Sequence, residues 1–199
     1  MVKWSTPMKY FFVQDYRQKY RFFSSEPIQN IQVKFTRLEK LWEEAKKRLM
    51  LLPKRILAQE QAFARALKLN EDSVEILHSG RLDEKRLKIK FFLFLQKQRT
   101  KHILLLVGEA ILLPVSGLLA LLPGPNVFFG VLALIMFTHW QALKGINKIS
   151  RKSRLFITSR TLNEWEQALL SQERKNLTAI LDKIEEEYNL KDIKKILYK

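Results

Sequence analysis

The centre of the chain reads ILLLVGEAILLPVSGLLALL over residues 103–122, PGPN over residues 123–126 and VFFGVLALIMFTHWQAL over residues 127–143. This stretch contains no Lys or Arg, and Glu109 is its only acidic residue. A helix that crosses a bilayer needs roughly 17–25 predominantly apolar residues, and both apolar segments fall in this range. We therefore predict two membrane-spanning helices joined by a tight turn. The alternative is a helical hairpin buried in a soluble domain, although the first segment is apolar on all sides, which suits lipid.

Basic residues flank the apolar stretch on both sides, whereas the turn carries no charge. They are Lys97, Arg99 and Lys101 before it, and Lys144, Lys148, Arg151, Lys152 and Arg154 after it. Basic flanks stay on the cytoplasmic side of a bacterial inner membrane or the matrix side of a mitochondrial one. We therefore predict a multi-pass membrane protein with both termini on that side and the turn on the other.

The composition narrows the class of protein and its partners. The formal net charge is +16 at pH 7, and the chain has no cysteine. An anionic inner leaflet attracts each nearby Lys or Arg by about 1 kcal/mol, so we expect lipid rather than nucleic acid as the partner. Cysteine ligands and disulfides are excluded. No phosphate loop, nucleophile elbow or paired His–carboxylate spacing occurs, so we predict no enzyme, no catalytic residue, no metal site and no cofactor.

The flanking regions predict amphipathic helices. The expected fold class is thus an all-α membrane protein, a two-span hairpin flanked by such helices. We expect a basic, mostly helical cytoplasmic or matrix region over residues 1–102, the transmembrane hairpin over residues 103–143 and a basic C-terminal helical region over residues 144–199.

Apolar residues at three- and four-residue steps place the flanking helices. They begin at Thr36, at Pro53, at residue 82 and at Thr161, and a short basic helix is expected within residues 190–199. Three further segments are interpreted locally: Ser73 as the cap of a short helix to Leu77, residues 150–159 as a basic linker or helix end, and the aromatic-rich residues 9–35 as the place of a single strand.

Two polar side chains are expected to meet inside the hairpin. Folding the spans back about the turn places Glu109 opposite His139 and Trp140. A carboxylate at that depth costs a few kcal/mol unless it is paired or protonated. A Glu–His pair that shares a proton offsets this cost, so we predict that Glu109 and His139 form a proton-sensitive intramembrane pair. A purely structural hydrogen bond between the helices, or snorkelling of Glu109, is the alternative.

The same stretch carries a recognisable motif. A mid-span proline precedes a P-x-P-N turn, aromatics and an [ST]-H-[WY]-x-A-x-x-G element; the residues are Pro114, Pro123, Pro125, Asn126, Phe128, Phe129, Thr138, His139, Trp140 and Gly145. With Lys101-His102 before it, this pattern resembles the core of the mitochondrial K+–H+ exchange-related family. Ile135 departs from that pattern, because an arginine often stands four residues before the histidine. Asn126 is expected to cap the second span.

The resemblance implies a function in potassium and proton balance across an energised membrane. We therefore predict an integral membrane protein implicated in monovalent cation (K+)–proton exchange, or in its assembly or regulation. Two spans cannot enclose a transport path, so a homo-oligomer or a membrane transport partner is expected, with K+ and H+ as ligands if transport is direct. A membrane-anchored scaffold acting through its helical flanks is the alternative, and a soluble nucleic-acid-binding helical protein is the third.

Overall fold

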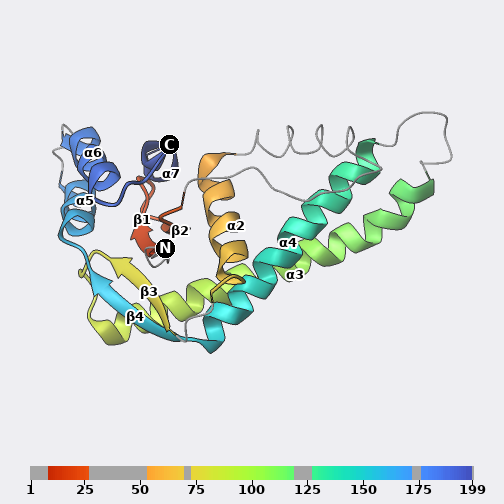
Figure 1. The fold of residues 1–199 in the computed structure, drawn as a ribbon, viewed down its shortest axis with the longest axis horizontal. Helices are drawn as coiled ribbons and strands as arrows, with labels where there is room; N and C mark the ends of the chain where they lie inside the picture. Colours follow the sequence, from red (N-terminus) through yellow and green to blue (C-terminus); the bar gives the residue numbers. More distant parts are fainter. Residues whose placement is uncertain (1–8, 27–52, 70–72, 119–126, 172–175, 199) are drawn as a thin grey trace, which may run out of the picture.

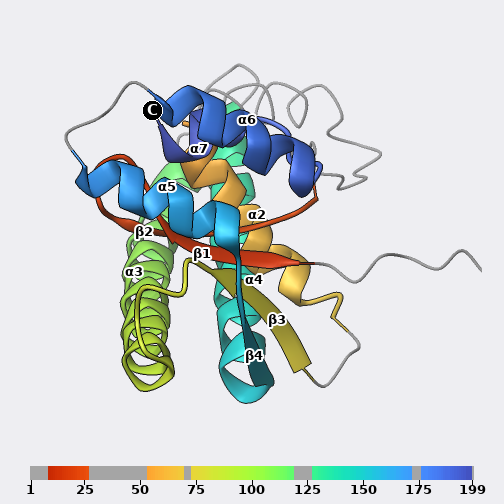
Figure 2. The same cartoon turned by 90° about the vertical axis from the view of Figure 1, so that its left-hand side faces the viewer.

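The computed structural model describes residues 9–26, 53–69, 73–118, 127–171 and 176–198. Within these ranges the chain forms a mixed four-stranded β-sheet with six helices distributed over its two faces (Figure 1, Figure 2). The elements in chain order are β1 (Tyr10–Gln14), β2 (Tyr20–Ser24), α2 (Lys54–Ala66), β3 (Ser73–His78), α3 (Glu84–Leu118), α4 (Val127–Arg151), β4 (Ser153–Thr158), α5 (Arg160–Leu170), α6 (Leu177–Glu187) and α7 (Ile193–Leu197).

The sheet combines a hairpin with two parallel pairings. Its strand order is β2-β1-β3-β4. β1 and β2 pair antiparallel, with Phe11 opposite Phe23. Asp15 fixes their turn, because its carboxylate accepts hydrogen bonds from the backbone N–H groups of Arg17 and Lys19, each at 2.9 Å. β3 pairs parallel with both β1 and β4. Parallel neighbours need a long crossover connection, and α3 with α4 forms the one between β3 and β4.

Each face of the sheet has its own hydrophobic core. Neighbouring side chains of a strand point to opposite faces, so Phe22 packs with α2, α3 and α4, whereas Phe23 packs with α5, α6 and α7. Phe12 and Phe11 divide between the two cores in the same way. The uninterrupted aromatic runs of β1 and β2 are therefore explained by burial on both sides.

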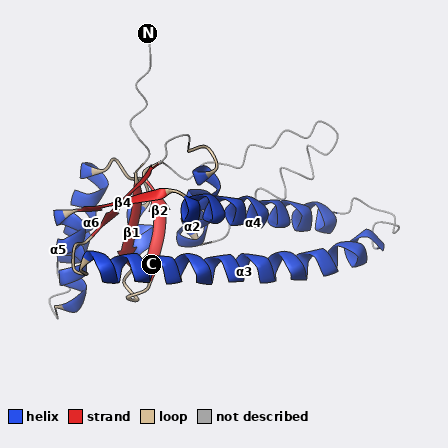
Figure 3. Cartoon of the chain, turned by 90° about the horizontal axis from the view of Figure 1, so that it is seen from below, coloured by secondary structure: helices blue, strands red, loops and turns tan. Residues whose placement is uncertain are grey.

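The two longest helices, α3 and α4, lie side by side and extend beyond the sheet (Figure 3). α2 packs against α4 at very short range, because a Cβ atom added at Gly145 would lie 1.7 Å from the backbone oxygen of Phe63. One helical turn further along α4, Lys148 Nζ donates a hydrogen bond of 2.6 Å to the backbone oxygen of Leu67 after the last turn of α2. These contacts fix α2 against α4.

The predicted all-α, two-span fold is wrong. The described residues include a mixed four-stranded sheet, and among them only α4, over Phe129–Arg151, is long and apolar enough to cross a membrane. This candidate rests on length and composition alone. The segment predicted as a first span continues the basic helix before it, and the two form one helix, α3, described to Leu118. A multi-pass topology with both termini on one side is therefore not supported.

The sequence predictions were wrong mainly where the structure has β-strands. The aromatic residues expected to hold a single strand form both β1 and β2. Ser73 begins β3 instead of capping a helix, and the basic linker predicted over residues 150–159 contains β4. The helix predicted to start at Pro53 is α2, which has Pro53 as its N-cap.

Some predictions cannot be located in the fold. The helix expected from Thr36 and the turn residues Pro123, Pro125 and Asn126 lie outside the described residues. The three predicted regions, residues 1–102, 103–143 and 144–199, are joined in one core, since Tyr10, Ala142 and Ile146 pack in the same cluster.

Candidate functional site

The candidate site is a cluster of carboxylate and imidazole groups where α2, α3 and α4 meet. α2 contributes Glu60, α3 contributes Lys101, His102 and Glu109, and α4 contributes His139. The rings of His102 and His139 are 5.4 Å apart between centroids. The cluster borders a cavity of about 310 Å³ whose lining includes Glu60, Lys101 and His139. Three separate helices thus bring five ionisable groups to one place.

The structure brings together the two residues that the sequence paired. His139 Nδ1 lies 2.6 Å from Glu109 Oε1, and the side chains of His139 and Glu109 are 16% and 10% exposed. With Glu109 ionised, the imidazole N–H donates and the carboxylate accepts. Such a short contact with a charged partner is stronger than a neutral hydrogen bond. The contact joins α3 to α4, whereas its sensitivity to protons stays a prediction.

A second carboxylate–imidazole contact lies beside the first. His102, which is fully buried, has Nε2 at 3.3 Å from Glu60 Oε2. The two atoms are close but not aligned for a hydrogen bond, and neither they nor His102 Nδ1 has a hydrogen-bond partner among the described residues. Glu60 Oε1 faces the ammonium group of Lys101 at 3.5 Å. The Glu60–His102 half of the cluster is therefore incompletely satisfied.

Burial controls the protonation of this half of the cluster. Desolvation raises the pKa of Glu60, although the nearby Lys101 ammonium opposes the rise. Desolvation also lowers the pKa of His102 to about 4, with smaller contributions from Lys101 and His139. A poorly hydrated environment disfavours the charged form of either group. His102 is accordingly a neutral imidazole with a free lone pair at physiological pH.

The cluster costs the fold stability. A buried polar atom without a partner costs about 1–3 kcal/mol, and Glu60 Oε2, both ring nitrogens of His102 and Glu109 Oε2 are such atoms among the described residues. Local violations of this kind concentrate at functional sites. The cluster is therefore a functional candidate on physical grounds as well as by its motif.

The other described residues of the predicted motif lie on α3 and α4. Pro114 lies inside α3, and α4 contains Phe128, Phe129, Trp140 and Gly145. Trp140 is 45% exposed, and Lys144 Nζ lies 3.6 Å from the centroid of its ring. This cation–π contact leaves Trp140 beside the cluster rather than within it. Gly145 provides the close approach of α2 and α4 described above.

Glu60 is the site residue that sequence reasoning missed. It is the only acidic residue between Lys54 and Lys68, and it stands three positions from both Leu57 and Phe63, which are buried. A single carboxylate on the apolar face of a predicted helix could have identified Glu60 as a candidate site residue. Its partners come from α3, so the local pattern could not identify them.

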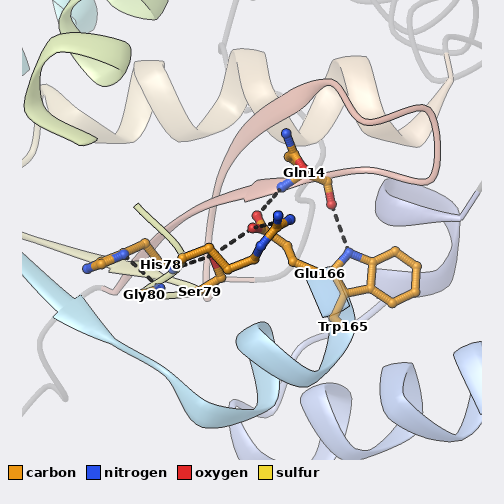
Figure 4. A network of polar contacts seen from close by, with 7 residues as sticks. Gln14, His78, Ser79, Gly80, Trp165 and Glu166 are labelled. Carbon is orange, nitrogen blue, oxygen red and sulfur yellow. Dashed lines mark hydrogen bonds and ion pairs between the residues drawn. The ribbon is translucent and has the colours of Figure 1, made fainter. Parts of the chain in front are cut away.

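A second buried polar network joins α5 to the sheet (Figure 4). Glu166, 1% exposed, accepts hydrogen bonds from the backbone N–H of Gln14 at 2.9 Å and the hydroxyl of Ser79 at 2.6 Å. Arg81 Nη1 lies 3.8 Å from the same carboxylate. Trp165 Nε1 donates to the backbone oxygen of Gln14 at 2.8 Å. Both carboxylate oxygens are satisfied, so we interpret this network as structural.

The fold and the site define an α/β protein with a carboxylate–imidazole cluster at a three-helix junction. The model of the mitochondrial K+–H+ exchange-related family matches residues 14–152, and the chain belongs to this family. The match runs from the end of β1 to the residue after α4, so it includes the whole cluster. No curated protein and no solved structure matches the chain. The family description relates the protein to mitochondrial K+–H+ exchange.

Proposed function

We propose that this protein is a membrane-associated component of K+–H+ exchange that assists or regulates the exchange together with other subunits. The observation that carries the proposal is the partly buried Glu109–His139 contact, held by helices inside the residues that the family model matches. A carboxylate and an imidazole in hydrogen-bond contact can share a proton near physiological pH. Glu109 and His139 are therefore the proposed proton-sensitive pair.

Exposed apolar side chains support the association with a membrane. Large apolar residues on α3 are at least one-third exposed, namely Ile103, Leu104, Leu105, Val107, Ile111 and Leu112. Soluble monomers rarely expose a large continuous apolar surface. α4 beside them contains the candidate span Phe129–Arg151. The basic residues at the start of this apolar surface, Lys97 and Lys101, suit an anionic leaflet.

The proposed role is that of a component, because the one candidate span among the described residues does not enclose an ion path. Backbone and side-chain polar groups in lipid must be satisfied within protein, so a path for K+ requires several helices around it. A second copy of the chain or another membrane protein would supply them. K+ and H+ are ligands of this chain only if it takes part in that path directly.

A membrane-anchored interaction protein is the second candidate. β4 is an edge strand of the sheet, and its Leu155 and Ile157 are 50% and 40% exposed. Edge strands readily pair with other chains. On this alternative the surface of β4 carries the function, and the cluster between α2, α3 and α4 only holds the helices together.

Proton flux in membrane vesicles tests the proposal. Vesicles from a host that contains the protein and from one that lacks it receive an outward K+ gradient, and a trapped dye reports the internal pH. We expect K+-dependent proton flux to fall several-fold without the protein and to return when it is restored. Liposomes that contain this protein alone should stay at background flux if another membrane protein supplies the ion path, and should show K+-dependent flux if further copies of the chain supply it. Equal flux with and without the protein in the native vesicles would favour the interaction-protein alternative.

A further inference from the structure

We propose that Glu60, His102 and His139 form a binding site for a divalent transition-metal ion, with Zn²⁺ as the ion that suits their donor atoms. The three residues come from α2, α3 and α4, and one ligand atom of each lies within 4.8 Å of the others. This proposal goes beyond the proposed function, and its test measures bound metal instead of proton flux.

The donor atoms nearest each other have no alternative partner. Glu60 Oε2 and His102 Nε2 are 3.3 Å apart, and neither has a hydrogen-bond partner among the described residues. Both are electron-pair donors when Glu60 is ionised and Nε2 of the neutral His102 carries no proton. Two lone pairs facing each other repel, whereas a cation held between them would satisfy both.

Glu109 would orient His139 as a metal ligand. A metal-bound histidine usually donates its second ring N–H to a carboxylate, which fixes the tautomer and the direction of the ring. His139 Nδ1 has this contact with Glu109 Oε1 at 2.6 Å. The contact leaves Nε2 of His139 for an ion. A structural hydrogen bond alone would give this geometry too, but it would not explain why the unpartnered atoms of Glu60 and His102 lie beside the same ring.

The spacing suits a small cation after a modest adjustment. Zn²⁺ lies about 2.0–2.2 Å from imidazole nitrogen and carboxylate oxygen. Its ligand atoms are therefore separated by about 3.3 Å in a tetrahedral site. Side-chain rotation must draw the three donor atoms inward from a spacing of up to 4.8 Å. The adjoining cavity of about 310 Å³ gives access for the ion and room for water as a fourth ligand.

The chemistry of the donors selects the ion. Two imidazoles with one carboxylate favour Zn²⁺ and similar transition metals, whereas Mg²⁺ and Ca²⁺ prefer oxygen ligands alone. Lys101 opposes a cation, since its ammonium group lies 3.5 Å from Glu60 Oε1. That contact involves only Oε1 of Glu60. Oε2 of Glu60, which has no hydrogen-bond partner among the described residues, therefore remains available to a cation.

Metal binding to the purified full-length protein tests the proposal. The protein is freed of metal with a chelator, its fold is checked by circular dichroism, and ZnCl₂ is added in a calorimeter. We expect one Zn²⁺ per chain, and no comparable binding of MgCl₂. Glu60→Gln and His102→Asn should each weaken Zn²⁺ binding at least tenfold, and Glu109→Gln less, because it keeps all three ligands.

His78 offers a matched control outside the site. Its Nδ1 accepts a hydrogen bond from the backbone N–H of Gly80 at 3.0 Å. His78→Asn keeps an acceptor near this position and should bind Zn²⁺ like the wild type. Zn²⁺ should also raise the melting temperature of the wild type and of His78→Asn, but not of His102→Asn. The proposal would be overturned if the folded wild type did not bind Zn²⁺ stoichiometrically, or if His102→Asn and Glu60→Gln bound Zn²⁺ as tightly as the wild type.

Discussion

Gly145→Ala is expected to destabilise the protein strongly. The added Cβ would lie 1.7 Å from the backbone oxygen of Phe63, so α2 and α4 would have to separate. Backbone atoms cannot move aside as a flexible side chain can. Overpacking typically costs about 1–3 kcal/mol, and we expect a loss of about 3 kcal/mol here. Since whole domains are stable by about 5–15 kcal/mol, urea denaturation should show a clearly lower midpoint.

Gly108→Ala is the matched control for this prediction. Gly108 also lies in a long helix, α3, but a Cβ atom there has no heavy atom within 4 Å. Replacing a helical glycine by alanine removes an unfavourable propensity of about 1 kcal/mol. Gly108→Ala should therefore leave the midpoint unchanged or raise it. Similar losses in both variants would mean that the close approach of α2 and α4 is not what limits residue 145.

Glu166→Leu is expected to cost about as much as Gly145→Ala, by a different mechanism. The leucine would leave the backbone N–H of Gln14 and the hydroxyl of Ser79 without their acceptor. An unsatisfied buried donor costs about 1–3 kcal/mol, and Arg81 would lose its partner as well. We expect the free energy of unfolding to fall by about 3 kcal/mol, measured by chemical denaturation.

Glu164→Leu, on the same helix, is the matched control. It removes a carboxylate that is exposed, so the comparison shows whether burial of the Glu166 carboxylate causes the loss of stability. Glu164 is more than one-third exposed, and it contacts Arg160 and Lys183 at 3.4 and 3.9 Å. Exposed ion pairs contribute about 0–1 kcal/mol. Glu164→Leu should thus change stability little. A Glu166→Leu protein as stable as Glu164→Leu would show that the network in Figure 4 does not hold α5 to the sheet.

Helical periodicity predicts part of the fold well. Pro53 and the apolar spacing after it locate α2, and the basic tail contains α7 as expected. The capping signal at Thr161 falls within one residue of the start of α5, where Ser159 is the actual cap and accepts a hydrogen bond from the N–H of Leu162. The apolar pattern that begins at Thr161 continues to Tyr188, but it forms two helices, α5 and α6, since Ser171 ends α5 in an extended conformation.

The sheet is the part that local patterns cannot predict. β1 and β2 are buried on both faces, so they lack the alternation that identifies a half-buried strand. β3 pairs with β1 across more than sixty residues of sequence, with Ile76 beside Tyr10. The residues around Ser73 do not indicate that this segment pairs with a strand so far away in the sequence.

The sequence predicted only the part of the site that lies on α3 and α4, which are neighbours in the chain. The sequence places Glu109 opposite His139 because a helical hairpin fixes their relative heights, and the structure places the two side chains in contact. Glu60 belongs to α2, and its position against α3 depends on tertiary packing. The cluster of Glu60, His102 and His139 therefore follows only from the arrangement of three helices.

Proton flux in vesicles that contain Glu109→Gln tests most directly whether K+–H+ exchange depends on the Glu109–His139 pair. Glutamine keeps the size and a hydrogen-bonding oxygen, so the variant should accumulate in the membrane like the wild type. Because glutamine cannot take up a proton, we predict that K+-dependent proton flux falls at least tenfold. The control Glu164→Gln should keep full flux. Normal accumulation of Glu109→Gln with full flux would contradict the account and leave the pair a structural hydrogen bond.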